Sequence, residues 1–221
     1  MTPEIVFPLG LGGNHARWLL SIDPKFDFKL CYSNKLEDKV KWICDNVYTN
    51  RTWNTWLQKE WRYRKQLDLS IVLTHFLSPN GNMLVDSEWQ RKKQLILRAD
   101  NYTNIAYHYF MVNLGLNNQT LSVVLEEFKD WETALEKVKH CNLASKTILT
   151  SDCIGEPTLN REWYQQIVTW AGYDDLYEQA SVIHAKYYQC RQQAAQDFVN
   201  YFESSEFQTH LNFYKNTYIA S

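Results

Sequence analysis

The sequence predicts an α/β protein in which a mainly parallel central sheet is covered by helices on both faces, giving three layers (α/β/α). Short apolar runs of the kind that form buried strands alternate along the chain with longer stretches of helical periodicity. The chain has 221 residues, of which 45 % are hydrophobic and 22 % charged, enough for one domain with a real core. We therefore expect a single domain over residues 1–221, whose C-terminal helical region begins at about residue 160.

In the first part of the chain, continuous and alternating apolar patterns predict three strands separated by helices. An apolar run that ends at a glycine indicates a buried strand, and Asn14 after it is a suitable helix N-cap. Phe26, Phe28 and Leu30 alternate with charged residues, which is the period of a strand. The run Ile71-Val72-Leu73 is typical of an interior parallel strand. The expected elements are strands at 4–9, 26–32 and 69–76 and helices at 14–22, 35–47 and 52–66.

The rest of the chain predicts two more strands and several helices. The segment QLIL before Arg98 and the segment TILT before Ser151 are short and mostly apolar, as buried strands are. Gly172 is a usual C-terminal cap for the helix that precedes it. The expected elements are strands at 94–97 and 147–150 and helices at 102–114, 121–141, 161–171 and 175–202, with residues 204–221 unassigned.

Composition and charge argue against several classes of protein. The formal net charge of −2 gives no electrostatic reason to expect a nucleic-acid partner. The five cysteines are far apart and odd in number, so we expect neither a disulfide framework nor a zinc site, and the histidines lack metal-ligand spacing. We expect no signal peptide, and no apolar run approaches the roughly 18 residues of a membrane helix. A cytoplasmic protein without a metal is therefore expected.

The turn Gly10-Leu11-Gly12-Gly13-Asn14 follows the first predicted strand and precedes a helix. Glycines bring backbone N–H groups close to a ligand, and the start of a helix adds the positive end of its dipole. The pattern fits neither a Walker A motif nor GxGxxG. We predict that this turn cradles a phosphate or sulfate, with His15 and Arg17 adding positive charge. For Arg17, a surface ion pair is the alternative.

Two further residues end predicted parallel strands, where ligands of such sheets bind. His75 follows Thr74 at one strand end, and it is a candidate general base because imidazole titrates near neutral pH. A structural hydrogen-bonding role is the alternative. Arg98 ends the next strand and is a candidate for bidentate phosphate binding, with an ion pair to Asp100 or another carboxylate as the alternative.

The order of these features resembles the sulfotransferase family, and most of all the short sulfotransferase-like proteins of bacteria and their phages. Four segments carry the resemblance, namely 5–20, the strand end Leu73-Thr74-His75-Phe76, the strand 95–98 with the helix around 106–110, and 148–172. The resemblance implies a fold like that of the P-loop nucleotide hydrolases. It also implies transfer of a sulfuryl group from 3′-phosphoadenylyl sulfate to an acceptor hydroxyl, which leaves 3′-phosphoadenosine 5′-phosphate.

The same resemblance assigns roles to residues. His75 would take the proton from the acceptor hydroxyl, and Arg17 would join the loop amides in stabilising charge on the sulfuryl group. The family's loop usually has Lys or Arg followed by Ser-Gly-Thr, where this chain reads Gly13-Asn14-His15-Ala16, so the charge is expected from Arg17 or His15. The catalytic residues implied are His75 and Arg17, and the cofactor-binding residues are Gly10, Gly12, Gly13, Asn14, His15, Arg17 and Arg98.

Two other functions stay open at this point. A divergent P-loop phosphotransferase would need a loop lysine and a magnesium-binding Ser, Thr or Asp, which we cannot place. A catalytically degenerate nucleotide- or anion-binding protein of the same fold is favoured by the missing loop cation. The partners expected are a nucleotide and a small-molecule or glycan acceptor. Candidates for lining the acceptor site are Trp53, Trp56, Trp61 and Trp89, although the first three have the helical spacing of core residues.

Overall fold

A computed structural model of the chain describes most of its N-terminal 48 residues, three short strands and a long C-terminal segment. The described residues are 3–7, 12–28, 30–31, 33–48, 71–75, 93–98 and 146–202, with the side chains of 72–75, 146, 191 and 193–202 left out. Within them, parallel strands alternate with helices, so the predicted α/β class is confirmed. The predicted helices at 52–66, 102–114 and 121–141 and the unassigned end at 204–221 lie outside these residues.

The sheet has four strands in the order β2-β1-β3-β4, and every pair is parallel. The strands are β1 (Glu4–Phe7), β2 (Val72–His75), β3 (Gln94–Arg98) and β4 (Lys146–Thr150), close to the predicted positions. All four residues of β1 are buried, as expected of a central strand covered on both faces. Among the described strands β2 pairs with β1 alone and lies at the sheet edge, not in its interior as the apolar run predicts.

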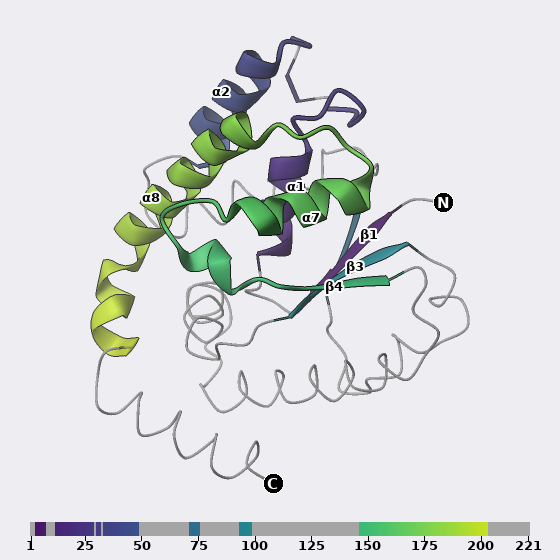
Figure 1. Ribbon diagram of the computed structural model, residues 1–221. Helices are drawn as coiled ribbons and strands as arrows, with labels where there is room; N and C mark the ends of the chain where they lie inside the picture. Colours follow the sequence, from purple (N-terminus) through teal and green to yellow (C-terminus); the bar gives the residue numbers. More distant parts are fainter. Residues whose placement is uncertain are drawn as a thin grey trace, which may run out of the picture.

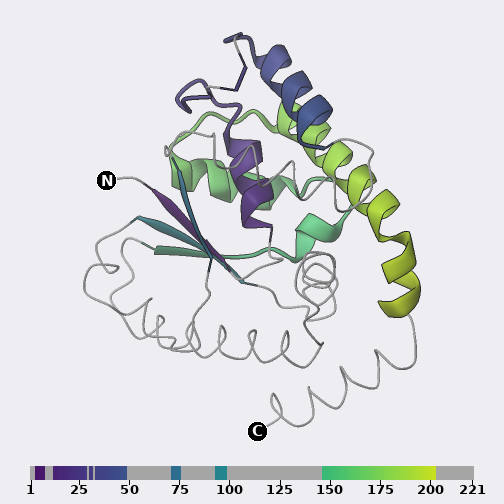
Figure 2. The same ribbon diagram turned by 180° about the vertical axis from the view of Figure 1, so that it is seen from behind.

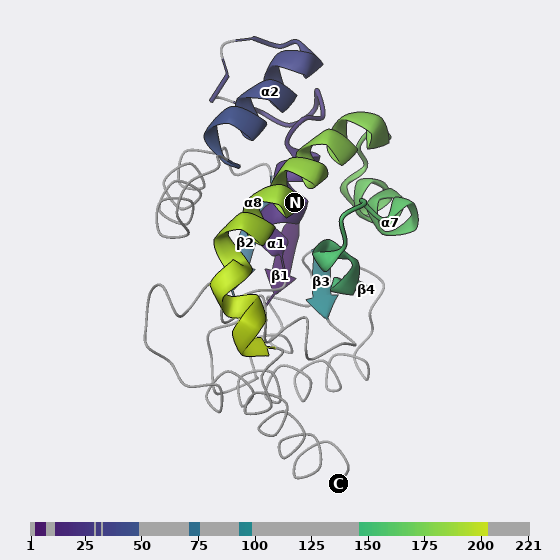
Figure 3. The ribbon, with the colours of Figure 1, turned by 90° about the vertical axis from the view of Figure 1, so that its left-hand side faces the viewer.

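The described helices lie on one side of the sheet, as the two opposite views show (Figure 1, Figure 2). They are α1 (Gly13–Leu20), α2 (Leu36–Asn46), the short 3-10 helix η2 (Asp152–Gly155), α7 (Arg161–Ala171) and α8 (Tyr177–Phe202). In Figure 3, α8 runs across α1, and α2 packs beside α8. α1 is thus enclosed between the sheet, α7 and α8, and seven of its eight residues are buried.

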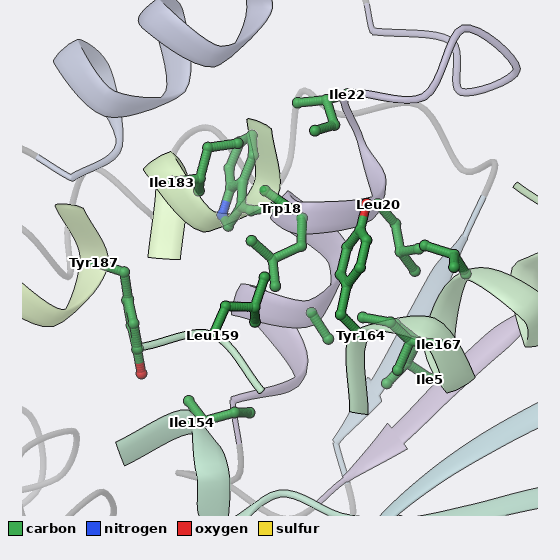
Figure 4. Packing of buried hydrophobic residues seen from close by; sticks show 14 of the residues in the cluster. Ile5, Trp18, Leu20, Ile22, Ile154, Leu159, Tyr164, Ile167, Ile183 and Tyr187 are labelled. Carbon is green, nitrogen blue, oxygen red and sulfur yellow. The ribbon is translucent and has the colours of Figure 1, made fainter. Parts of the chain in front are cut away.

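The hydrophobic core lies where β1, α1, α7 and α8 meet. Ile5 of β1, Trp18 and Leu20 of α1, Ile167 of α7 and Ile183 of α8 converge there (Figure 4), each with 0–1 % of its surface exposed. Burial of a side chain of this size contributes about 1.5–3 kcal/mol. The apolar residues of α1 therefore do more than cover the sheet, since they also hold the two C-terminal helices to it.

Residues 26–32 were predicted to form a strand, and this prediction is wrong. The described residues of this segment form turns and irregular backbone, beginning with a turn in which Asp23 accepts a 2.7 Å hydrogen bond from the Lys25 amide. Phe26 and Phe28 are buried and Asp27 is exposed, so the alternation is real. It arises because Phe28 packs edge-on against Trp18 and Trp42 of two helices, not because it belongs to a sheet.

Candidate functional site

The candidate site lies at the carboxyl edge of the sheet. His75 is the last residue of β2 and pairs in register with Phe7, the last residue of β1. Arg98 is the last residue of β3 and pairs with Thr150, the last residue of β4. Because the strands are parallel and about 4.8 Å apart, the backbones of His75 and Arg98 flank the end of β1 at a separation on the order of 10 Å.

The strand order also marks this edge as a binding position. β1 has its sequence successor β2 on one side and β3 on the other, so the direction of winding reverses between β1 and β3. In open parallel sheets, ligands bind beside the carboxyl ends of the strands at such a reversal. α1 begins directly after β1, so its N-terminus lies at the same position. The structure therefore brings the backbones of three predicted features to one edge.

α1 begins two residues earlier than the predicted cap allows. Asn14 was expected to cap the helix, but the N-cap is Gly12, whose φ of 72° is in the left-handed region, and Asn14 is already helical. Gly12 has no side chain with which to cap this end. The helix start thus keeps the donor character that the anion prediction requires. Gly10 lies outside the described residues.

Packing also accounts for both glycines at this start. A Cβ on Gly12 would lie 2.5 Å from Cδ1 of Ile154 in η2, and a Cβ on Gly13 would lie 2.2 Å from the ring of Phe7. Such distances are far below van der Waals contact, so a larger residue fits at neither position. The glycine pair therefore brings the start of α1 against the end of β1 and against η2, whether or not a ligand binds.

Arg17 and Asn14 supply the polar side chains of α1 near its start. Arg17 is 4 % exposed and lies four residues after Gly13, on the same face of the helix. A guanidinium stays charged in proteins, so this is a buried positive charge one turn from the helix start. Asn14 is half-buried, and its Oδ1 has no hydrogen-bond partner among the described residues.

Ser151 is a site residue that the sequence prediction missed. It follows β4, its amide donates a 2.8 Å hydrogen bond to the carbonyl of Arg98, and it is 4 % exposed. Its hydroxyl Oγ is buried, and no residue in the described segments hydrogen-bonds to it. The signal was present, because the rule that selected His75 and Arg98 as strand ends also applies to the residue after Thr150.

The thiol beside the site is not a nucleophile near neutral pH. Cys153 lies in η2, next to the Ile154 that covers Gly12. Burial, the largest cause, raises the pKa of Cys153 to about 12, so almost none of it is thiolate at pH 7. In the part of the chain that the structure describes, no three His, Cys, Asp or Glu side chains gather as metal ligands.

His15 lies in a different setting from the one predicted. Its ring is 1 % exposed, its Nδ1 is 2.9 Å from the hydroxyl of Tyr48 and its Nε2 is 3.0 Å from Nδ1 of His184. The ring also stacks on Tyr187, with 3.9 Å between centroids. Because both nitrogens are engaged inside the helical layer, we expect the charge at the turn to come from Arg17 and not from His15.

Comparison of this chain with protein-family models, with curated proteins and with solved structures finds no match. Among the helices of the described segments, none combines the length and apolar character needed to cross a membrane. The tryptophans predicted to line an acceptor site, Trp53, Trp56, Trp61 and Trp89, are outside the described residues.

Proposed function

We propose that this protein transfers a sulfuryl group from 3′-phosphoadenylyl sulfate to an acceptor hydroxyl, on a sulfotransferase-like, P-loop-type three-layer fold. The observation that carries the proposal is the meeting of the α1 start, the His75 strand end and the Arg98 strand end at one edge of a parallel sheet. These are the three positions that the resemblance assigns to the 5′-phosphosulfate, the base and the 3′-phosphate.

In the proposed reaction the acceptor oxygen attacks sulfur while the bond from sulfur to the bridging phosphate oxygen breaks. His75 takes the acceptor proton, and 3′-phosphoadenosine 5′-phosphate leaves with the bonding electron pair. The amides at the start of α1 and the Arg17 guanidinium stabilise the negative charge that develops on the phosphate. The buried Ser151 hydroxyl is a further donor at this edge, and Arg98 holds the 3′-phosphate in two parallel hydrogen bonds.

A second candidate function is binding of a nucleotide or anion without catalysis. It is favoured by the packing of Phe7 and Ile154, which accounts for Gly13 and Gly12 without any ligand, and by the absence of a lysine in Gly13-Asn14-His15-Ala16. A divergent phosphotransferase is the third, and nothing among the described residues favours it specifically.

Binding is tested by the rise in unfolding temperature with 3′-phosphoadenosine 5′-phosphate and with adenosine 5′-phosphate, which lacks the 3′-phosphate. The wild type should prefer the first nucleotide, and Arg98→Gln should remove that preference with a loss of about tenfold or more in affinity. Lys41→Gln, an equal change of charge on the exposed face of α2, is the matched control and should bind like wild type. Absence of any nucleotide shift would overturn the proposal.

Asn14→Asp separates binding from stability. The helix start has no acidic residue in its first turn, so an aspartate there should raise the free energy of unfolding by about 0.3–1 kcal/mol through the helix dipole. The same charge should repel a bound phosphate and weaken nucleotide binding. If the free energy of unfolding and the affinity for the nucleotide both rose or both fell, the result would contradict an anion site at α1. If the nucleotide binds, loss of sulfuryl transfer in His75→Gln distinguishes the enzyme from the non-catalytic binder.

A further inference from the structure

A chain of hydrogen bonds runs through the buried contact between α1 and α8. His15 of α1 and His184 of α8 are 1 % and 0 % exposed, and 3.0 Å separates Nε2 of the first from Nδ1 of the second. At one end, Nδ1 of His15 lies 2.9 Å from the hydroxyl of Tyr48, just after α2. At the other end, Nε2 of His184 lies 2.8 Å from the backbone carbonyl of Glu156. All four ring nitrogens are therefore engaged.

The carbonyl at one end fixes the direction of the whole chain. A carbonyl oxygen only accepts, so Nε2 of His184 carries a hydrogen and, in the neutral ring, Nδ1 is an acceptor. His15 must then donate from Nε2, which leaves its Nδ1 to accept from the Tyr48 hydroxyl when the ring is neutral. The neutral state thus has one arrangement, in which both histidines carry hydrogen on Nε2 and every group is satisfied.

This series of hydrogen bonds can accept one additional proton. If it is added to Nδ1 of His15, the Tyr48 hydroxyl turns from donor to acceptor and the other hydrogen bonds stay in place. The hydrogen between the two rings can then lie on either nitrogen, so the two histidines share the charge. The stacked face of Tyr187, 3.9 Å from His15 between centroids, is a favourable surface for such a cation.

A second additional proton does not fit. It would place hydrogens on both Nε2 of His15 and Nδ1 of His184, which are 3.0 Å apart and would then be two donors facing each other inside the core. We propose that His15 and His184 form a single-proton pair, and that exclusion of the second proton loosens the attachment of α8 to α1 in mildly acidic conditions. This inference holds whether or not the sheet edge binds a nucleotide.

Apart from each other, the described groups that hydrogen-bond to or stack on the two rings of the pair are two phenols and one backbone carbonyl. Tyr48 faces it from the end of α2, Tyr187 faces it from α8, and both are phenols that are neutral at this pH. Glu156 faces His184 through its backbone carbonyl, and its residue is exposed. On α1 itself the nearest charge is Arg17, two positions along and therefore on another face of the helix.

Because folding excludes a proton from the pair, the free energy of unfolding should depend on pH with a measurable slope. Two histidines of an unfolded chain take up two protons below their ordinary pKa of about 6.5, whereas the folded pair takes up at most one. Since the unfolded state binds more protons, folding weakens as pH falls, by about tenfold in the folding constant per pH unit for each excluded proton. The pair's contribution is complete above about pH 7 and declines below about pH 6.5.

The test compares urea unfolding of the full chain from about pH 7.5 to 5.5, above the range where most carboxylates titrate. In His184→Asn the amide oxygen of the new side chain can accept from Nε2 of His15, so His15 can bind a proton in the folded as in the unfolded state. The slope of the unfolding free energy against pH should therefore fall by about one proton. In Tyr48→Phe the acceptor needed by the first proton is gone, so the slope should rise toward two excluded protons. All other titrating groups are the same in the two variants, so they cannot cause slopes that change in opposite directions. Equal slopes in the three proteins would overturn the proposal.

A second measurement uses the wild type alone and does not depend on the folding of any variant. Nitrogen-15 NMR of the imidazole rings at pH 7.5 should show hydrogen on Nε2 of both His15 and His184. On acidification of the folded protein, one proton should appear in the pair. Two doubly protonated rings in the folded state, or hydrogen on Nδ1 alone in either neutral ring, would contradict the single-proton pair.

Discussion

The helices α1 and α7 pack against each other but are ended by different means. α7 is closed by its own neighbours in sequence, because Asn160 Oδ1 accepts a 2.9 Å hydrogen bond from the Trp163 amide and Gly172 ends the helix with a φ of 75°. α1 is closed locally at its end, where Ser21 bonds to the carbonyls of Arg17 and Trp18, but distant residues hold its surroundings. Ile154 packs over Gly12 at its start, and the Asp174 amide donates to Asp23 in the turn after its end. The start of α1 and the turn after its end therefore depend on the rest of the fold.

The two helix starts also differ in how well they could bind an anion. Asn160 satisfies one of the first amides of α7, so that helix start has less to offer a ligand. The N-cap of α1 is Gly12, which has no side chain, and this helix start lies at the reversal point of the sheet. The helix whose start and following turn are held by distant residues is thus also the one suited to bind an anion. Changes in those contacts should alter the stability of the protein more than changes in the caps of α7.

The largest expected effect on the free energy of unfolding follows removal of the hydrogen bond between the Asp174 amide and the Asp23 carboxylate, in the turn after α1. The Asp23 carboxylate, 2 % exposed, accepts from the amides of Lys25 and Asp174 at 2.7 Å each. Asp23→Ala leaves both amides without this partner and should lower the free energy of unfolding by about 2–4 kcal/mol. Lys25→Ala removes the exposed ion pair with Asp174 and an exposed 3.2 Å hydrogen bond to the Gly172 carbonyl, and it should change little. Equal effects in urea unfolding would show that the end of α1 does not depend on Asp23.

A smaller effect is expected at the start of α1. Gly13→Ala places a Cβ 2.2 Å from the Phe7 ring and should cost about 1–3 kcal/mol through overpacking. The matched control is Gly172→Ala at the end of α7, where a Cβ meets nothing within 4 Å. Backbone strain at its φ of 75° should cost only about 1 kcal/mol there. The contrast between local and long-range ends would fail if the control were the more damaging change.

The smallest effect compares the two asparagines near the helix starts. Asn160→Ala removes a real cap and should lower the free energy of unfolding by about 1 kcal/mol. Asn14→Ala should change it by only a few tenths, because Asn14 lies inside α1 and its Oδ1 has no partner. Thermal unfolding of both variants measures the difference. A full capping loss at Asn14 would restore the prediction that it caps the helix.

The same contrast explains which parts of the molecule could be predicted from sequence. The bounds of α7 and the position of β3 follow from residues within a few places of them, namely Asn160, Gly172 and the run before Arg98, and they were predicted correctly. The strand order, the N-cap at Gly12 and the placement of β2 at the edge depend on segments many residues apart. Periodicity contains no information about such contacts.

For the candidate site, the sequence could predict which residues end strands but not which distant residues contact them. His75 and Arg98 were placed at strand ends because apolar runs stop there, and the structure has both strands ending at those residues. His15 was assigned to the turn because it is adjacent in sequence, yet its ring meets His184, 169 residues away. Its partner could not be found without the packing of α8 on α1.

The central place of β1 in the sheet also bears on how the chain is made. Glu4 of β1 pairs with Val72 of β2, 68 residues later in the chain, so synthesis at about 5–20 residues per second leaves this strand unpaired for roughly 3–14 s. During that time the four residues Glu4-Ile5-Val6-Phe7 expose an unsatisfied backbone and apolar side chains on the ribosome. β1 therefore becomes buried only after β2 has been made.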